Sequence, residues 1–120
     1  IKYLRNKKDI HLYKDVFFNP ISMNTLAEGI FFLTSNNNWK PGIYNFGSQE
    51  RISKYDFGIK LADNFDLMKK FILPSKISDS NLRASRPRDM SMDISKFEKI
   101  FKTKLPKIDQ EMSLLREDYG

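Results

Sequence analysis

The chain has 120 residues and a formal net charge of +6 at pH 7, with twenty-one lysines and arginines against fifteen aspartates and glutamates. This length suits one small domain with a modest core. The absence of cysteine and the single histidine exclude disulfide bridges and the usual cysteine and histidine metal sites. No apolar run approaches the roughly 20 residues that span a membrane, so we expect a soluble, cytoplasmic domain with no membrane partner.

The first part of the chain is predicted to form the end of a helix, a strand and a loop. Residues 1–8 resemble the polar end of a helix. Because the sequence starts with isoleucine, we expect it to be a piece of a longer protein. Residues 10–13 have the apolar character of a short strand, and Pro20 favours an aromatic loop over residues 15–20.

A second helix is predicted to begin at a capping box, in which Thr25 is the N-cap and Glu28 reaches back to its backbone. This helix should run to about Ser35. A turn-rich connection follows over residues 36–42, and Gly42–Gly47 alternates like a strand. The apolar residues at helical spacing are Leu26, Ala27, Ile30, Phe31 and Leu33.

Ser53 is predicted to cap a third helix that extends to Phe65. Phe71–Pro74 then has the composition of a short strand that ends at the proline. Residues 75–85 are polar enough to form an exposed loop. This loop leads directly into the most highly charged motif of the chain.

That motif is Arg86-Pro87-Arg88-Asp89. Pro87 biases Arg86 toward extended conformations, so the side chain loses less entropy when it grips a ligand. Guanidinium groups bind phosphate, and a neighbouring carboxylate can accept hydrogen bonds from sugar hydroxyls. The motif therefore predicts binding of a nucleotide diphosphate-sugar by Arg86, Arg88 and Asp89. The alternative is a solvated turn whose charges pair with one another.

After this motif, Met90 and Met92 are predicted to fill gaps in the core. Ser95 and Glu98 form another capping box, which begins a fourth helix, and Asp109 is predicted to cap a fifth. The fifth helix places three apolar residues on one face, Met112, Leu115 and Tyr119. Helices and short strands in this order predict a small mixed α/β fold.

The residues that would carry out catalysis are missing. No glycine-rich turn of the type G-x-G-x-x-G follows a predicted strand, so the chain has no cofactor-binding residues. There is no Tyr-x-x-x-Lys pair that could exchange protons with a hydroxyl or ketone. The single histidine stands alone, which excludes a Ser/His/Asp set. We therefore expect no catalytic and no metal-binding residues in the chain.

Six motifs occur in a recognisable order: Asn19–Pro20, Leu26–Ile30, Gly42–Gly47, Ser53–Phe57, Arg86–Phe97 and Leu105–Pro106. Together they span nearly the whole chain. In this order the sequence resembles the C-terminal, substrate-binding part of the extended short-chain dehydrogenase/reductases, most closely that of the dTDP-4-dehydrorhamnose reductases. The resemblance implies that residues 1–120 form an RmlD-like sugar-nucleotide substrate-binding domain, the C-terminal portion of an extended Rossmann-type protein.

The resemblance further implies an N-terminal Rossmann domain, missing here, that binds NADPH or NADH and carries the Tyr-x-x-x-Lys machinery. The implied reaction is hydride transfer to the C4 ketone of a dTDP-linked deoxysugar. Related epimerases have an Arg-x-Gly-Asp stretch that contacts diphosphate and ribose, and Arg86 and Asp89 occupy the matching positions. Arg88 stands where that motif has glycine. Phe18-Asn19-Pro20 replaces a second phosphate-binding arginine, which favours the reductase branch.

Other interpretations remain open at this stage. The parent protein could be a non-catalytic regulatory or scaffolding member of the same superfamily, or another nucleotide-sugar epimerase or dehydratase. A nucleic-acid-binding module rests on charge alone, and the aromatic residues follow core spacing instead of forming a stacking surface. We expect no nucleic-acid partner. The sequence leaves open the sugar, the base, the choice between NADPH and NADH, and homodimer formation.

Overall fold

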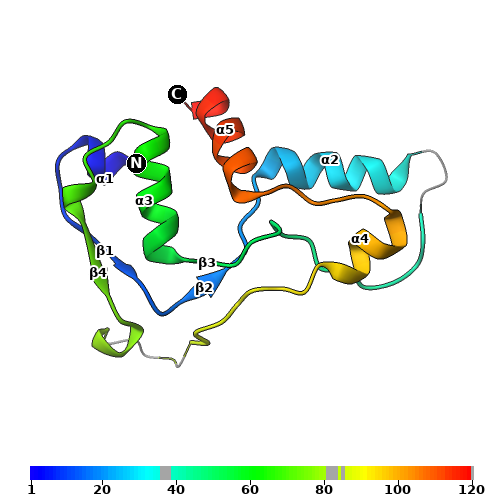
Figure 1. The fold of residues 1–120 in the computed structure, drawn as a ribbon, viewed down its shortest axis with the longest axis horizontal. Helices are drawn as coiled ribbons and strands as arrows, with labels where there is room; N and C mark the ends of the chain where they lie inside the picture. The colour runs from blue at the N-terminus through cyan, green and yellow to red at the C-terminus, as the bar shows by residue number, and fades with distance from the viewer. Residues whose placement is uncertain (36–38, 81–83, 85, 120) are drawn as a thin grey trace.

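The computed structural model describes residues 1–35, 39–80, 84 and 86–119. The molecule is elongated, with extents of 49 × 35 × 20 Å (Figure 1). In chain order its elements are α1 (Lys2–Arg5), β1 (Ile10–Tyr13), β2 (Phe17–Phe18), α2 (Met23–Thr34), β3 (Ile52–Ser53), α3 (Lys54–Asn64), η1 (Lys69–Phe71), β4 (Ile72–Ser75), η2 (Ile77–Asp79), α4 (Ser95–Phe101) and α5 (Ile108–Tyr119). The predicted mixed α/β class is confirmed.

One end of the molecule is a parallel pair of strands covered by α3 (Figure 1). β1 and β4 pair in parallel from Ile10 opposite Ile72 to Tyr13 opposite Ser75. Pro74 does not end the strand as predicted, because β4 has a partner on one side only and needs no second row of hydrogen bonds. Gly58 lets α3 approach β1 closely, since a Cβ at this position would clash with the Leu12 side chain.

A second, smaller sheet connects this end to the rest of the chain. β2 and β3 are antiparallel, with Phe17 opposite Ser53. On its other side, Phe17 donates its N–H to the carbonyl of Arg88 at 2.7 Å and accepts from the N–H of Met90 at 2.9 Å. The loop predicted over residues 15–20 therefore contains a strand with neighbours on both sides. No turn or periodicity signal marks it, because it is only two residues long.

The start of α2 is fixed by a buried cluster of polar groups. Ser22, and not the predicted Thr25, is the N-cap, and its hydroxyl accepts from the N–H of Thr25 at 3.1 Å. The carboxylate of Glu111, on α5, accepts from the N–H of Ser22 at 2.5 Å and from the hydroxyl of Thr25 at 2.6 Å. Glu28 is not needed as a capping partner, because Glu111 supplies the carboxylate from another helix.

The capping prediction for α3 is confirmed, whereas that for α4 is wrong. Ser53 accepts from the N–H of Asp56 at 3.0 Å. At α4 the carboxylate of Asp93 accepts from the N–H of Ser95, and no side chain caps the helix from Ile94. Glu98 points elsewhere, to the N–H of Leu105 at 3.0 Å.

The remaining capping and core predictions have mixed outcomes. Asp109 lies inside the first turn of α5 and pairs with Lys60 instead of serving as the cap. Met90 and Met92 are exposed, not core residues. Of the three residues predicted to share one face of α5, Met112 is buried and Leu115 is half-buried, whereas the side chain of Tyr119 lies outside the described residues. The predicted turn at 36–38 and the loop residues 81–83 and 85 also lie outside them.

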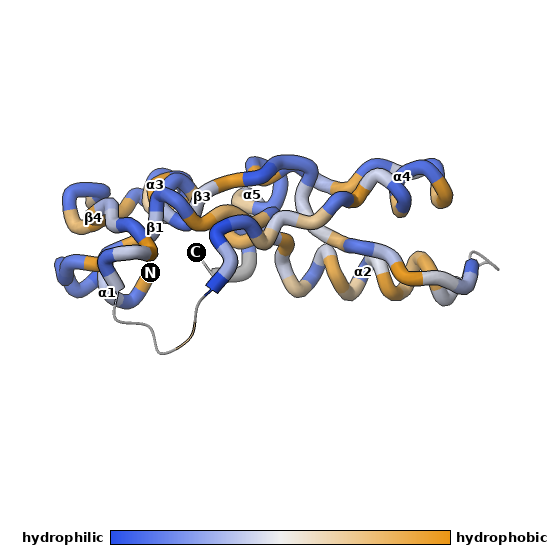
Figure 2. Tube along the Cα trace, turned by 90° about the horizontal axis from the view of Figure 1, so that it is seen from below, coloured by the Kyte–Doolittle hydropathy of each residue, from blue (hydrophilic) through white to orange (hydrophobic). Residues whose placement is uncertain are grey.

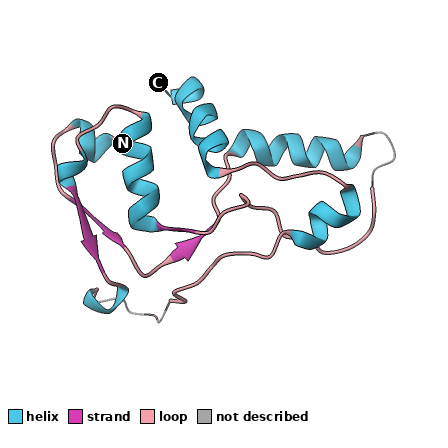
Figure 3. Ribbon diagram, viewed as in Figure 1, coloured by secondary structure: helices cyan, strands magenta, loops and turns pink. Residues whose placement is uncertain are grey.

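Gly42–Gly47 does not form the predicted strand (Figure 3). The side chains of this segment do alternate between the two sides of the chain: Tyr44 and Phe46 are half-buried, whereas Ile43 is 87% exposed. The Phe46 ring packs edge-on against Phe97 of α4, with centroids 4.9 Å apart. A strand also needs a neighbouring strand to hydrogen-bond, and the described residues provide none at this position.

α2 carries an apolar face that is open to solvent. Met23, Ile30 and Phe31 are 76%, 55% and 73% exposed, and their spacing of seven and then one residue places them on one side of the helix. Figure 2 shows α2 and α4 as separate layers at one end of the molecule, with hydrophobic residues recurring along α2. The helix itself ends at Thr34, as predicted to within one residue.

We predict that Glu111→Ala destabilises the fold by about 3 kcal/mol, because it removes two charge-assisted hydrogen bonds and leaves buried donors on Ser22 and Thr25 unpaired. Chemical denaturation measures this change. The matched control is Asp109→Ala on the same helix, whose carboxylate is 81% exposed and pairs with Lys60. That variant should lose less than about 1 kcal/mol. Equal losses in the two variants would contradict the role given to Glu111.

Candidate functional site

A small pocket lies where β1 ends, α3 begins and the 86–93 loop passes by. It holds about 190 Å³ and is lined by Tyr13, Val16, Lys54, Ile77, Arg86, Pro87 and Met90. Two of these side chains are cationic and none is a carboxylate. Such a lining attracts an anion, because the positive charges are not neutralised by the walls of the pocket itself.

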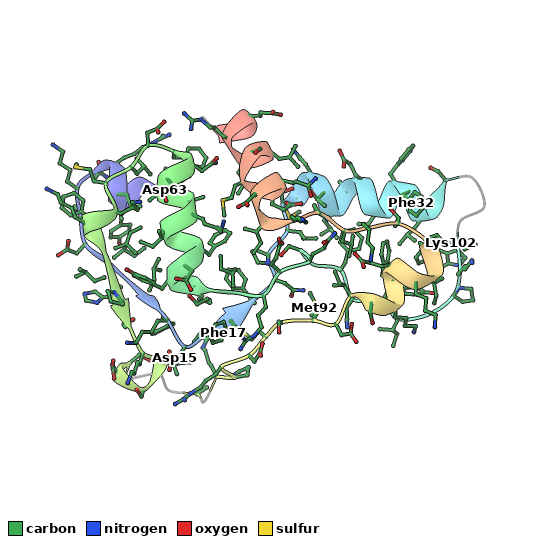
Figure 4. All side chains as sticks on the ribbon, in the orientation of Figure 1. Asp15, Phe17, Phe32, Asp63, Met92 and Lys102 are labelled. Carbon is green, nitrogen blue, oxygen red and sulfur yellow. The ribbon has the colours of Figure 1, made fainter. Side chains whose placement is uncertain are left out.

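The 86–93 loop that supplies Arg86 is held by backbone contacts on two sides. The first set is the pair of hydrogen bonds between Phe17 and residues 88 and 90. The second comes from buried Asn19, whose side-chain amide donates to the carbonyl of Met92 and accepts from its N–H, both at 3.0 Å. Figure 4 labels Phe17 and Met92, which lie along the path of the 86–93 loop. The loop is thus fixed although its own side chains are mostly exposed.

Arg86 is exposed and lines the pocket, and among the described residues it has no ion pair or hydrogen bond. Pro87 lies next to it in the same wall. A planar guanidinium that is not already paired can form two parallel hydrogen bonds with a phosphate. The position of Arg86 therefore suits the binding role that the sequence predicted for it.

Asp89 belongs to the same loop but does not line the pocket. Its carboxylate accepts from the N–H of Ser91 at 3.0 Å and from the Ser91 hydroxyl at 2.6 Å. It also accepts from Nε of Arg51 at 2.9 Å. These hydrogen bonds from Ser91, followed by the Arg51 charge, lower the pKa of Asp89 below its ordinary value. Asp89 is therefore an ionised group with several partners in its own protein.

Arg51 was not among the residues predicted from the sequence. Its guanidinium carbon lies 3.6 Å from the centre of the Phe17 ring, so the planar group stacks on the ring while it pairs with Asp89. The residue immediately precedes β3 and crosses β2 to reach the loop. Its partners are far away in the sequence, and no local motif marks an arginine for such a contact.

Arg88 does not line the pocket either. Its Nε lies 3.9 Å from Oδ2 of Asp15, and Oδ1 of Asp15 accepts from the N–H of Ile77 at 2.9 Å. Figure 4 places Asp15 beside the turn that follows β1. The three residues predicted to bind the ligand, Arg86, Arg88 and Asp89, all belong to the 86–93 loop. Only Arg86 lines the pocket.

A larger groove of about 860 Å³ lies between α2 and α5. Its lining mixes Lys104 and Lys107 with the carboxylate of Glu28, and Lys104 is already paired with Glu98 at 2.7 Å. Because its charges partly cancel and it contains none of the motif residues around Arg86, it is the weaker candidate for an anion site.

The part of the chain that the structure describes contains neither a metal-binding cluster nor a membrane-spanning helix. No group of three or more histidine, aspartate or glutamate side chains is arranged to hold a metal ion there. None of the described helices is long and apolar enough to cross a membrane.

Comparison with solved structures gives the fold. The structure is similar to dTDP-4-dehydrorhamnose reductase from Bacillus anthracis, solved in complex with NADP, with a TM-score of 0.86 and 14% sequence identity over 98% of this chain and 41% of that chain. For the reductase from Yersinia enterocolitica the TM-score is 0.77, with 19% identity over 99% and 41%. dTDP-glucose 4,6-dehydratase from Bacillus anthracis, in complex with NAD, has a TM-score of 0.72, with 12% identity over 98% and 36%.

The chain thus spans about two fifths of the length of the reductases that it matches. No curated protein sequence matches it. The family profile described as "RmlD substrate binding domain" matches residues 1–119. This match covers the six motifs, the 86–93 loop and the pocket, and the chain therefore belongs to the RmlD substrate-binding domain family.

Proposed function

We propose that residues 1–120 form the substrate-binding domain of an NAD(P)-dependent nucleotide-sugar reductase and bind the nucleotide diphosphate of the substrate at Arg86. The observation that carries this proposal is an arginine without a partner among the described residues, in a pocket without carboxylates, in a chain of this family. A Rossmann region elsewhere in the polypeptide would bind NADPH or NADH and supply hydride transfer to the C4 ketone of a dTDP-linked deoxysugar.

In this proposal the chain contributes binding and orientation. Arg86 donates to the phosphate oxygens, and Pro87 limits the freedom that the loop loses on binding. The contacts of Phe17 and Asn19 keep the loop in place before the ligand arrives. Fixing the diphosphate at one end positions the sugar at the other, where the reaction takes place.

Asp89 and Arg88 are secondary contacts in this proposal. The Oδ2 atom of Asp89 has a hydrogen bond from Arg51 and retains a lone pair that can accept from a sugar hydroxyl. Arg88 is separated from Asp15 by 3.9 Å, a loose ion pair that a phosphate could replace. Both side chains are exposed and belong to the same loop as Arg86, although they do not line the pocket.

The Rossmann region is also the proposed partner of the apolar face of α2. Met23, Ile30 and Phe31 are exposed there, and Ile43 is exposed in the neighbouring 42–47 segment. Gly29 of α2 packs against the Phe46 ring of that segment, so the helix and the segment form one unit. An exposed apolar surface of this kind marks an interface. The reductases of similar fold have more than half of their length outside the matched part, which is enough for such a region.

A second candidate is an epimerase or dehydratase of nucleotide sugars, which the similarity to dTDP-glucose 4,6-dehydratase supports at the level of the fold. A non-catalytic member of the superfamily would keep the same pocket. The sequence of the Rossmann region, with or without Tyr-x-x-x-Lys and a glycine-rich turn, separates these candidates from a reductase.

We predict that Arg86→Ala weakens binding of dTDP by the native full-length polypeptide about tenfold or more, because a charge-assisted contact with phosphate is lost. Isothermal titration calorimetry measures the dissociation constant. Arg5→Ala removes the same charge from α1, outside the pocket, and should leave the affinity unchanged. An unchanged dissociation constant for Arg86→Ala would overturn the proposed function.

We predict that Phe31→Ser has a different effect on stability in two forms of the protein. In the 120-residue chain the side chain is 73% exposed, so the melting temperature should hardly change. In the native full-length polypeptide the same change should cost about 2 kcal/mol, because a buried phenylalanine is lost. Met68→Ser, at the opposite end of the molecule, is the control for general effects of removing exposed apolar groups. Equal effects of Phe31→Ser in both forms would contradict the interface.

A further inference from the structure

The pocket that contains Arg86 has a second cation, Lys54. This residue is the first of α3, and its half-buried side chain lines the wall beside Tyr13 and Val16. Its backbone N–H donates to the carbonyl of Val16 at 3.0 Å. The backbone N–H of Lys54 is thus already satisfied. The residue lines this pocket and also the neighbouring apolar pocket that contains Phe18 and Phe57.

The ammonium group of Lys54 is not neutralised by a carboxylate of the described residues. The contact found for its Nζ is with the Phe18 ring, whose centre is 5.9 Å away. The other lysine of α3, Lys60, pairs with Asp109 at 2.6 Å. Lys54 therefore differs from Lys60, since it is half-buried and its charge has no carboxylate partner among the described residues.

The position of Lys54 is also fixed by buried residues. Ser53, which is 1% exposed, caps α3 and pairs with Phe17 of β2. Val16, which is 2% exposed, holds the N–H of Lys54. The same short strand β2 bonds to the loop that carries Arg86, so both cations are attached to one support.

We propose that Lys54 is a second anion-binding residue of this pocket and that it contacts the diphosphate together with Arg86. This inference rests on the proposed function. A guanidinium presents a planar fork to one phosphate, whereas an ammonium is a mobile point charge on a flexible stem that reaches a second one. Two cations from separate elements suit a ligand with two linked phosphates better than a single phosphate or a neutral sugar.

The test is a titration of the native full-length polypeptide with inorganic pyrophosphate, dTDP and the uncharged nucleoside thymidine. Lys54→Met keeps the unbranched stem and removes the charge, and it should weaken binding of pyrophosphate and dTDP about tenfold while affinity for thymidine is unchanged. Lys54→Arg should restore affinity to within about threefold. Lys99→Met on α4 removes the same charge outside the pocket and should have no effect.

The outcomes separate this inference from the proposed function. If Lys54→Met binds pyrophosphate as wild type does while Arg86→Ala does not, Lys54 is not an anion contact and the proposed function stands. If Lys54→Arg binds pyrophosphate and dTDP as weakly as Lys54→Met does, or if Lys99→Met binds them equally weakly, a specific binding role for the charge at position 54 is refuted. If wild type does not bind dTDP, both proposals fail. Should Lys54→Met not fold, Lys54→Gln gives the same comparison.

Discussion

The candidate site depends on the main chain of two residues, Phe17 and Phe18, which form β2. Phe17 hydrogen-bonds to the 86–93 loop on one side and lies opposite Ser53 on the other. Through these contacts Arg86 and Lys54, 32 positions apart in the sequence, line one pocket. The Phe18 ring packs edge-on against Phe57 of α3, with centroids 5.4 Å apart, which anchors the strand to the core. A strand of two residues is enough to connect these segments because one edge pairs with β3 and the other hydrogen-bonds to the 86–93 loop.

The charges of the chain fall into two groups around this strand. Arg51 is paired with Asp89, and Arg88 lies 3.9 Å from Asp15, so these two arginines add little net positive charge near the pocket. Arg86 and Lys54 have no carboxylate partner among the described residues, and they share the pocket. The net charge of +6 therefore says less about where an anion would bind than the positions of the individual charges do. Exposed ion pairs contribute little stability, whereas an uncompensated pair of cations in one cavity has a clear use in binding an anion.

Local sequence patterns predicted local structure well and contacts between distant segments poorly. The Ser53 cap and the strand at 10–13 depend on neighbouring residues, and both are present. The local pattern predicts Thr25 as the cap of α2, whereas Ser22 is the cap, and Glu111, which accepts from the Thr25 hydroxyl, lies 86 positions away on α5. The alternation over 42–47 described its side chains correctly, yet a strand needs a partner that the described residues lack. The sequence predicts a binding role for Arg86 because this arginine stands beside a proline in a charged motif. Arg51 and Lys54 carry no such local mark.

The central claim is that the nucleotide diphosphate binds at Arg86, in the pocket between the end of β1 and the start of α3. A crystal structure of the native full-length polypeptide with dTDP tests it most directly. We predict phosphate oxygens within hydrogen-bonding distance, about 2.7–3.2 Å, of the Arg86 guanidinium. Phosphates bound instead in the groove beside Lys104 and Lys107, with the Arg86 pocket empty, would contradict the claim.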